Sequence, residues 1–381
     1  MDHRILLSLK ILFLVSVLVM ATFAGCTAEE QTVGELQALV SEREPDQPSL
    51  LPDWNDGEYH DYDATTHMLT IFNDNFPDLV DVFSIGKSIQ GRDIWCVRIT
   101  NEKNNQAKLS CLIDGCIHGN EWEAGDACLY LADYLLINFG NNATVTHILN
   151  ISKVYIIPLV NPDGRQQNTR WNADNIDLNR NFDVDFGRLR GHSIRIGKLF
   201  GWIKIPYIYI PRVGTLTNCG RRPFSEPEAQ AVRDVMKTIN YHDFSFYVNC
   251  HTAIHNIATP WSAFKPPSEL TQQEINVHDS VKNWVDENTE YESTPLTYHP
   301  SGTVTDWCFK EFRVPSFTLE LLSQDYEPGM GEGKHDHLVH WMNTTLPIFL
   351  YLLVNIENLH DWQLPTIQPC LPEGVPPPPL H

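Results

Sequence analysis

Two apolar runs of this chain each end at a histidine, and this arrangement limits the folds that the chain can adopt. The run 109–117 is typical of a short buried strand, and His118 follows it directly. Residues 122–136 then have the apolar spacing of a helix. The run 244–250 is again strand-like, and His251 follows it. Polar groups placed where a strand ends and a helix begins form the usual sites of open α/β sheets, so we predict an α/β fold.

A His and a Glu three positions apart, joined by a distant second His, indicate a metal site. His118 and Glu121 bracket the sequence His-Gly-Asn-Glu, and His251 is the third candidate. Two imidazole nitrogens and one carboxylate leave the fourth zinc position open for water, which distinguishes a catalytic zinc from a structural one. We therefore predict one Zn²⁺ per chain, held by these three side chains.

One carboxylate interrupts the apolar run 317–322. Glu320 is the ionisable residue of this run, and such a side chain among apolar neighbours requires an explanation. A general base that takes a proton from water beside a metal ion is the explanation that fits the ligands above. The pattern therefore favours a metallopeptidase.

In these motifs the chain resembles the M14 family of zinc carboxypeptidases, over roughly residues 59–351. The resemblance implies an α/β fold in which a single domain contains a mixed β-sheet flanked by helices. It also implies that His118, Glu121 and His251 bind zinc and that Glu320 is the catalytic base. The expected activity is hydrolysis of the C-terminal peptide bond, on peptides with a free C-terminal carboxylate.

The same resemblance implies roles for five further residues. Arg170 would stabilise the oxyanion that develops on the attacked carbonyl. Arg180, in the motif Asp-Leu-Asn-Arg-Asn-Phe, would bind the terminal carboxylate through its planar guanidinium, with Asn179 as an additional donor. Asp177 would accept a hydrogen bond from the outer ring nitrogen of the first histidine ligand. Tyr298 would close over the bound substrate.

The residues expected in the pocket for the terminal side chain are uncharged. The resemblance places Thr305 and Ser262 there, so a basic terminal residue would find no counter-charge. We therefore expect a preference for neutral or apolar terminal residues. Asn120 stands where the pancreatic enzymes have an Arg, which is closer to the regulatory and microbial branches of the family.

Three other functions remain open on the sequence alone. A cell-wall peptide hydrolase and an amidohydrolase of N-acyl amino acids could share this fold, because a fold does not fix a substrate. A binding module without catalysis would be expected to lack a metal ligand or the glutamate base, and the chain retains all four residues. The net charge of -21 argues against a nucleic-acid partner.

The ends of the chain are expected to lie outside the catalytic domain. Residues 1–25 are typical of a secretory signal peptide, and Cys26 stands where a lipoprotein carries its lipid. An uncleaved leader acting as a membrane anchor is the alternative. Residues 26–56 are predicted to be a flexible tether, 57–360 the catalytic domain and 361–381 a Pro-rich tail. Either interpretation predicts an extracytoplasmic enzyme, membrane-tethered or secreted.

The segment 187–222 differs from the rest of the chain in its charge. It contains eight Lys and Arg residues and many aromatic and aliphatic residues, with no acidic residue. One interpretation is a β-hairpin packed on the domain with solvated charges. The other is a surface loop that contacts anionic lipid head groups or a partner.

Overall fold

The computed structural model describes residues 59–187, 218–262, 270–293, 300–321 and 335–363. The predicted leader, tether and most of the Pro-rich tail lie outside the described residues, as does Tyr298. Of the basic segment 187–222, only its first residue and residues 218–222 are described.

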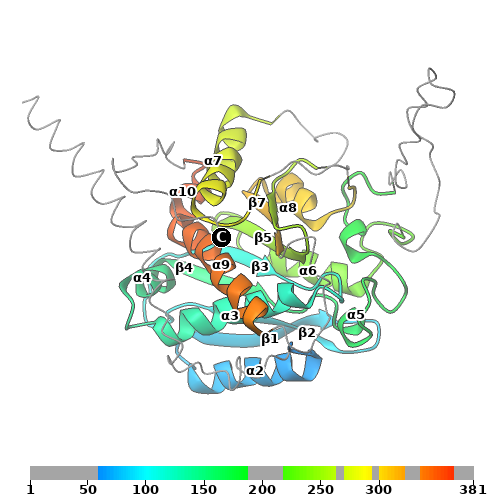
Figure 1. Ribbon diagram of the computed structural model, residues 1–381, viewed down its shortest axis with the longest axis horizontal. Coiled ribbons are helices and arrows are strands. Elements are labelled where there is room, and N and C mark those ends of the chain that lie inside the picture. The colour runs from blue at the N-terminus through cyan, green and yellow to red at the C-terminus, as the bar shows by residue number, and fades with distance from the viewer. Residues whose placement is uncertain (1–58, 188–217, 263–269, 294–299, 322–334, 364–381) are drawn as a thin grey trace, which may run out of the picture. The chain divides into compact units, whose positions relative to one another are not determined.

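The described part of the chain is built around a seven-stranded β-sheet with the strand order β1-β2-β4-β3-β5-β7-β6 (Figure 1). The four central strands β4, β3, β5 and β7 are parallel, whereas β1, β2 and β6 pair antiparallel with their neighbours. The predicted α/β fold with a mixed sheet is therefore confirmed. The strands are β1 (Val80–Lys87), β2 (Asp93–Ile99), β3 (Leu109–Asp114), β4 (Ser152–Ile157), β5 (Phe244–Thr252), β6 (Asn256–Ala258) and β7 (Ser316–Leu321).

Helices cover both faces of this sheet (Figure 1). Helices α3, α4, α9 and α10 pack on one face, and α6 and α8 pack on the other. Among the described residues, no helix combines the length and the apolar character needed to span a membrane. The helices are α2 (Tyr62–Asn75), α3 (Trp122–Asn138), α4 (Ala143–Ile151), α5 (Pro162–Gln166), α6 (Pro227–Thr238), α7 (Gln272–Asn288), α8 (Val304–Phe312), α9 (His335–Val354) and α10 (Ile356–His360), with a 3-10 turn η1 at Leu178–Arg180.

Strand β5 shows why the central strands have nearly continuous apolar sequences. All nine of its residues are buried, because helices cover the sheet on both sides. Tyr247 belongs to the core that β5 shares with α6 and α8, where it packs with residues such as Val232 and Trp307. Successive side chains on a strand point to opposite faces, so Asn249 and His251 lie on the same side of β5 as Tyr247. On this side of β5, the apolar core therefore gives way to polar side chains toward the carboxyl end of the strand.

Candidate active site

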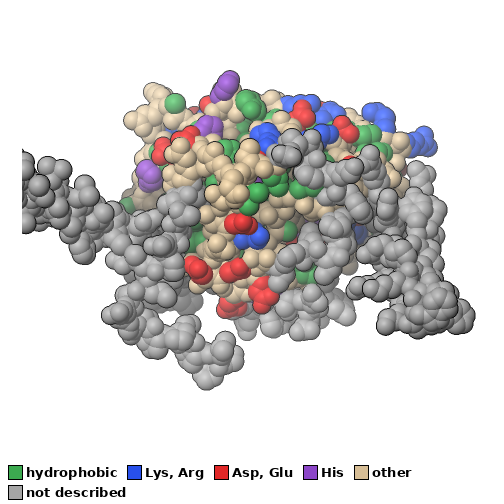
Figure 2. Space-filling view, turned by 90° about the horizontal axis from the view of Figure 1, so that it is seen from above, with side chains coloured by type: hydrophobic (Ala, Val, Ile, Leu, Met, Phe, Trp, Pro, Cys, Tyr) green, Lys and Arg blue, Asp and Glu red, His purple; other side chains and the backbone are tan. Residues whose placement is uncertain are grey.

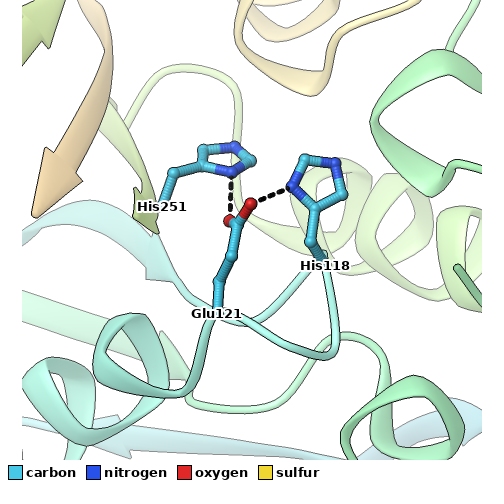
Figure 3. A group of neighbouring side chains, drawn as sticks. All are labelled: His118, Glu121 and His251. Atoms are coloured by element: carbon cyan, nitrogen blue, oxygen red, sulfur yellow. Dashed lines mark hydrogen bonds and ion pairs between the residues drawn. The ribbon is translucent and has the colours of Figure 1, made fainter. Parts of the chain in front are cut away.

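Two of the predicted ligands lie in the turn between β3 and α3, and the third lies near the end of the neighbouring strand β5 (Figure 3). Glu121 is the N-cap residue of α3 but caps no backbone N–H, because its carboxylate points between the two histidine rings. His118 Nδ1 lies 2.7 Å from Glu121 Oε1, and His251 Nδ1 lies 2.7 Å from Glu121 Oε2. The three side chains therefore converge on one point.

Their geometry and burial fit a zinc ion. One potential ligand atom from each of His118, Glu121 and His251 lies within 4.8 Å of the others, and this is the one such group found among the described residues. All three residues are buried. Burial alone would raise the pKa of Glu121, but the two histidines outweigh it and hold that pKa below its ordinary value. Two ring nitrogens and one carboxylate are a donor set of catalytic zinc sites.

The outer nitrogens of both rings have acceptors, which leaves the inner nitrogens for a metal. His118 Nε2 lies 3.0 Å from Asp177 Oδ1, at the position expected from the sequence. His251 Nε2 lies 2.5 Å from Asn249 Oδ1. An acceptor at the outer nitrogen keeps the ring proton there and directs the Nδ1 lone pair into the site. Burial would raise the pKa of Asp177, but Arg170 and other nearby positive charges hold it well below its usual range.

The glycine between the first two ligands is required by close packing. A Cβ atom on Gly119 would lie 2.0 Å from the backbone carbon of Gly164, in the turn that begins α5. Real Cβ atoms essentially never approach so closely, so any other residue would push this turn away from the ligand loop. Close packing against Gly164 therefore explains why the His-Gly-Asn-Glu motif has glycine at position 119.

Glu320 lies beside the ligands on the adjacent strand. In the parallel pairing of β5 with β7, its register partner is His251, and both side chains line one cavity. Glu320 is half-buried, and this burial raises the pKa of its carboxyl above the ordinary value. A carboxylate with a raised pKa at a cavity wall suits a group that takes up and releases a proton.

Three further predicted residues line the same cavity: Arg170, Asn179 and Arg180. Arg170 donates from Nε to Asp177 at 3.1 Å and from Nη1 to Glu121 at 3.3 Å. Arg180 donates from Nη1 to the backbone oxygen of its neighbour, while its buried Nε has no partner among the described residues. Asn179 accepts from the Val304 N–H at 2.9 Å, at the start of α8.

Thr305 does not line the cavity, contrary to the expectation from the sequence. It lies in the first turn of α8, and its hydroxyl contacts the Thr318 hydroxyl at 2.8 Å. Thr318 lines the cavity in its place, together with Thr303 and the predicted Ser262. Tyr298 lies outside the described residues, so its expected role stays a prediction.

A carboxylate lies next to this wall but is already engaged. Asp306 is 1% exposed and accepts from the backbone N–H and the hydroxyl of Ser262 at 3.1 and 2.6 Å. It is absent from the residues that line the cavity. The cavity wall here therefore presents hydroxyl groups in front of a buried acid.

Sequence reasoning overlooked residues that strand alternation could have found. Thr318 stands two positions before Glu320 on β7, and Asn249 stands two positions before His251 on β5. Residues two apart on a strand share a face, so each lies on the side of its strand that carries the predicted site residue. A polar amide in the apolar run 244–250 was the signal, since buried amides need partners.

This fold and this set of potential metal ligands together are those of the zinc carboxypeptidases. The model for the zinc carboxypeptidase family (Peptidase_M14) matches residues 65–330, most of the chain. The chain belongs to the zinc carboxypeptidase family.

Individual relatives are distant. Carboxypeptidase D of Drosophila melanogaster is 27% identical over 69% of this chain, and carboxypeptidase B2 of Rattus norvegicus is 26% identical over 69%. The matched regions span 20% and 63% of those two proteins, respectively. The crystal structure of thrombin activatable fibrinolysis inhibitor has a TM-score of 0.63 at 21% identity, covering 85% of this chain and 80% of that one. The crystal structure of carboxypeptidase A from Helicoverpa armigera has a TM-score of 0.62 at 20% identity, covering 87% of this chain and 81% of that one. These structures support the fold.

Proposed function

We propose that this protein is a metallocarboxypeptidase that removes the C-terminal residue of peptides. The observation that carries the proposal is one cavity that contains the three metal ligands, the carboxylate of Glu320 and the guanidinium of Arg180. The ligands and Glu320 provide for hydrolysis, and Arg180 provides for recognition of a free carboxylate. A buried guanidinium in this cavity favours an exopeptidase over an endopeptidase, because it can bind a free C-terminal carboxylate.

The chemistry follows from the positions of these side chains. Zinc held by His118, Glu121 and His251 would supply a Lewis acid that polarises the scissile carbonyl and acidifies a water molecule. Glu320 would take the proton of that water as its oxygen bonds to the carbonyl carbon. The same carboxyl would then give the proton to the leaving nitrogen as the C–N bond breaks. Arg170 would donate to the carbonyl oxygen as negative charge develops there.

Replacing Arg180 tests whether the enzyme recognises a free C-terminus. Arg180 Nε is buried without a partner among the described residues, as expected of a group that awaits an anionic ligand. Hydrogen bonds to charged groups contribute about 1.5–3 kcal/mol each. We expect Arg180→Ala to lower kcat/KM for free-acid dipeptides about 10²–10³-fold and to leave the slow cleavage of amidated ones nearly unchanged.

Two further variants make this measurement specific. Arg180→Lys keeps the charge but not the two-pronged geometry and should fall between the wild type and Arg180→Ala. Arg233→Ala removes an arginine that pairs with Asp234 on α6, and it should leave the ratio of acid to amide cleavage unchanged. An unaltered ratio in Arg180→Ala would count against an exopeptidase.

The pocket for the terminal side chain predicts the substrate preference. Ser262, Thr303 and Thr318 line it with hydroxyl groups, and the carboxylate of Asp306 is engaged by Ser262. We expect neutral terminal residues, aliphatic or aromatic, to be cleaved faster than Lys or Arg. One methylene in such a pocket contributes about 1–3 kcal/mol of discrimination, so the preference should be graded. A panel of blocked dipeptides differing in the last residue measures this, and a strong preference for terminal Arg would refute it.

We also propose that the protein acts outside the cytoplasm, tethered through Cys26 or its leader, with 187–222 contacting anionic lipid. The leader-like sequence and the excess of positive charge in that segment support this. Outside residues 188–217, Figure 2 shows Lys and Arg side chains of described residues gathered toward the upper right of one face, although the net charge is -21. A basic side chain near an anionic surface contributes roughly 1 kcal/mol.

A chain shortened to begin at Glu29 lacks the leader and Cys26, so it separates tethering by the N-terminus from lipid contact by 187–222. It should still bind anionic vesicles weakly at low salt, and replacing Lys198, Trp202 and Lys204 together should abolish that binding without affecting cleavage of small peptides. If the shortened chain does not bind such vesicles even at low ionic strength, the segment does not contact lipid.

A further inference from the structure

One buried acid near the metal ligands is not used by the proposed chemistry. Asp114 is the last residue of β3 and is fully buried. Its carboxylate accepts from the Tyr247 hydroxyl at 2.7 Å and from Asn249 Nδ2 at 2.5 Å. Burial raises the pKa of Asp114 to about 7, but both neighbours donate to it, so above neutral pH the ionised form has all its partners.

Asp114 fixes the orientation of the Asn249 side chain. An amide group has a donating end and an accepting end of nearly the same shape, so packing alone does not orient it. An ionised carboxylate only accepts hydrogen bonds, and the NH₂ end of Asn249 therefore faces Asp114. The oxygen of Asn249 then faces His251 Nε2 at 2.5 Å. The parallel pairing of Asp114 with Asn249 in register holds this arrangement between β3 and β5.

A second amide competes for the same ring nitrogen of His251. Asn179 Nδ2 lies 3.0 Å from the same His251 Nε2, and the Asn179 oxygen is held by the Val304 N–H. A ring nitrogen that carries a proton suits Asn249, whereas a bare ring nitrogen suits Asn179. Zinc binding at Nδ1 requires the proton on Nε2, because the neutral ring carries only one N–H. His251 therefore needs the Asn249 oxygen to counter a competing donor.

We propose that Asp114 acts through Asn249 as a positioning pair that keeps the proton of His251 on Nε2 and its lone pair on Nδ1, toward the metal. The inference rests on the proposed function, since it assumes that the His251 ring binds zinc. The two predicted histidine ligands would then be held by different hydrogen-bond partners. His118 meets the carboxylate of Asp177 directly, whereas His251 meets a carboxylate through an intervening amide.

The first experiment removes the amide while keeping the side chain's size. Asn249→Leu should weaken zinc binding about 10–100-fold at pH 8, measured by competition with a chromophoric chelator. In the zinc-loaded protein, the downfield proton resonance of the His251 Nε2–H should disappear or move upfield, because its acceptor is gone. Ser245→Ala is the matched control, since Ser245 is a buried polar residue of the same strand that donates to the backbone oxygen of Ile356. It should leave both readouts unchanged.

The second experiment exchanges the two partners. In the double variant Asp114→Asn with Asn249→Asp, the new carboxylate can accept from His251 and from the new amide, whose oxygen can accept from Tyr247. Each of the three contacts keeps a donor and an acceptor, with residue 114 now the donor between positions 114 and 249 and the acceptor for His251 retained. Zinc affinity should therefore stay within about threefold of the wild type, although two buried residues have changed. A merely structural role for Asn249 gives no reason for this rescue.

The outcomes separate this inference from the proposed function. A wild-type protein that binds no zinc overturns both. A wild type that binds zinc, with Asn249→Leu binding it as tightly as Ser245→Ala does, overturns the positioning role alone. If Asn249→Leu does not fold, the exchanged pair decides: zinc affinity close to the wild type supports the inference, and a loss of more than tenfold overturns it.

Discussion

Replacement of Glu320 by Gln should abolish most of the hydrolytic activity while leaving zinc bound. The amide has nearly the same size as the carboxylate, but it cannot take a proton from water, and general acid–base catalysis contributes about 10²–10⁴-fold. Glu320 is not among the three metal ligands, and its strand pairs with β5 through backbone hydrogen bonds that the substitution keeps. We therefore expect kcat on a blocked dipeptide to fall by about 10²–10⁴-fold, with KM and zinc content close to those of the wild type.

The control for this prediction is the same chemical change elsewhere. Glu311→Gln alters an exposed glutamate on α8 and should leave kcat unchanged. Zinc content by elemental analysis and the thermal unfolding midpoint show whether either variant has lost its metal or its fold. A Glu320→Gln variant whose kcat remains within tenfold of the wild type would mean that another group takes the proton.

The three candidate metal ligands could be picked out in the sequence because their signal is local. His118 and His251 each terminate an apolar run, and a polar side chain at the carboxyl end of a buried parallel strand is a common site position. What local pattern cannot give is the pairing of strands. Glu121 and His251 are 130 residues apart, and they meet because β3 and β5 are neighbours in the sheet. For that step the prediction depended on resemblance to a family.

Side-chain direction was the least predictable feature of the site. Thr305 was expected in the pocket, but it lies in the first turn of α8, and its hydroxyl contacts that of Thr318, which lines the cavity. Rotation of a helix about its axis is set by packing of its apolar residues, here Trp307 and Phe312 in the core that α8 shares with the sheet. A strand is easier to predict, because its strict alternation places Thr318 on the face of Glu320.

The position of Arg180 also depends on contacts that the local sequence does not reveal. Its loop is fixed by contacts distant in sequence, since the Phe182 N–H donates to the backbone oxygen of Gly302 at 3.1 Å. Gly302 has a φ of +70°, and a Cβ there would lie 2.3 Å from the backbone oxygen of Arg180. The motif around Arg180 identifies the residue, but backbone contacts with Gly302 hold the loop that carries it. Neither fact is visible in the motif alone.

Removal of zinc should abolish activity without unfolding the protein. His118 and His251 already contact Glu121 at hydrogen-bond distance, and the three residues lie on or next to strands of a sheet covered by helices on both faces. This differs from small zinc domains, which unfold without their metal. Zinc at a free concentration of 100 times its Kd should stabilise the fold by about 2.7 kcal/mol, so the metal-free protein should unfold at a lower temperature but with the same cooperativity.

The measurement combines metal content with recovery of activity. Elemental analysis should find about one zinc per chain. Dialysis against a chelator should remove both zinc and activity, and added Zn²⁺ should restore them. His118→Ala and His251→Ala should each bind zinc far more weakly, because a two-ligand site loses most of its affinity, whereas His242→Ala changes an exposed histidine and should match the wild type. Full activity in protein shown to contain no metal would refute the assignment of these three residues as ligands, and with it the role assigned to Glu320 beside them.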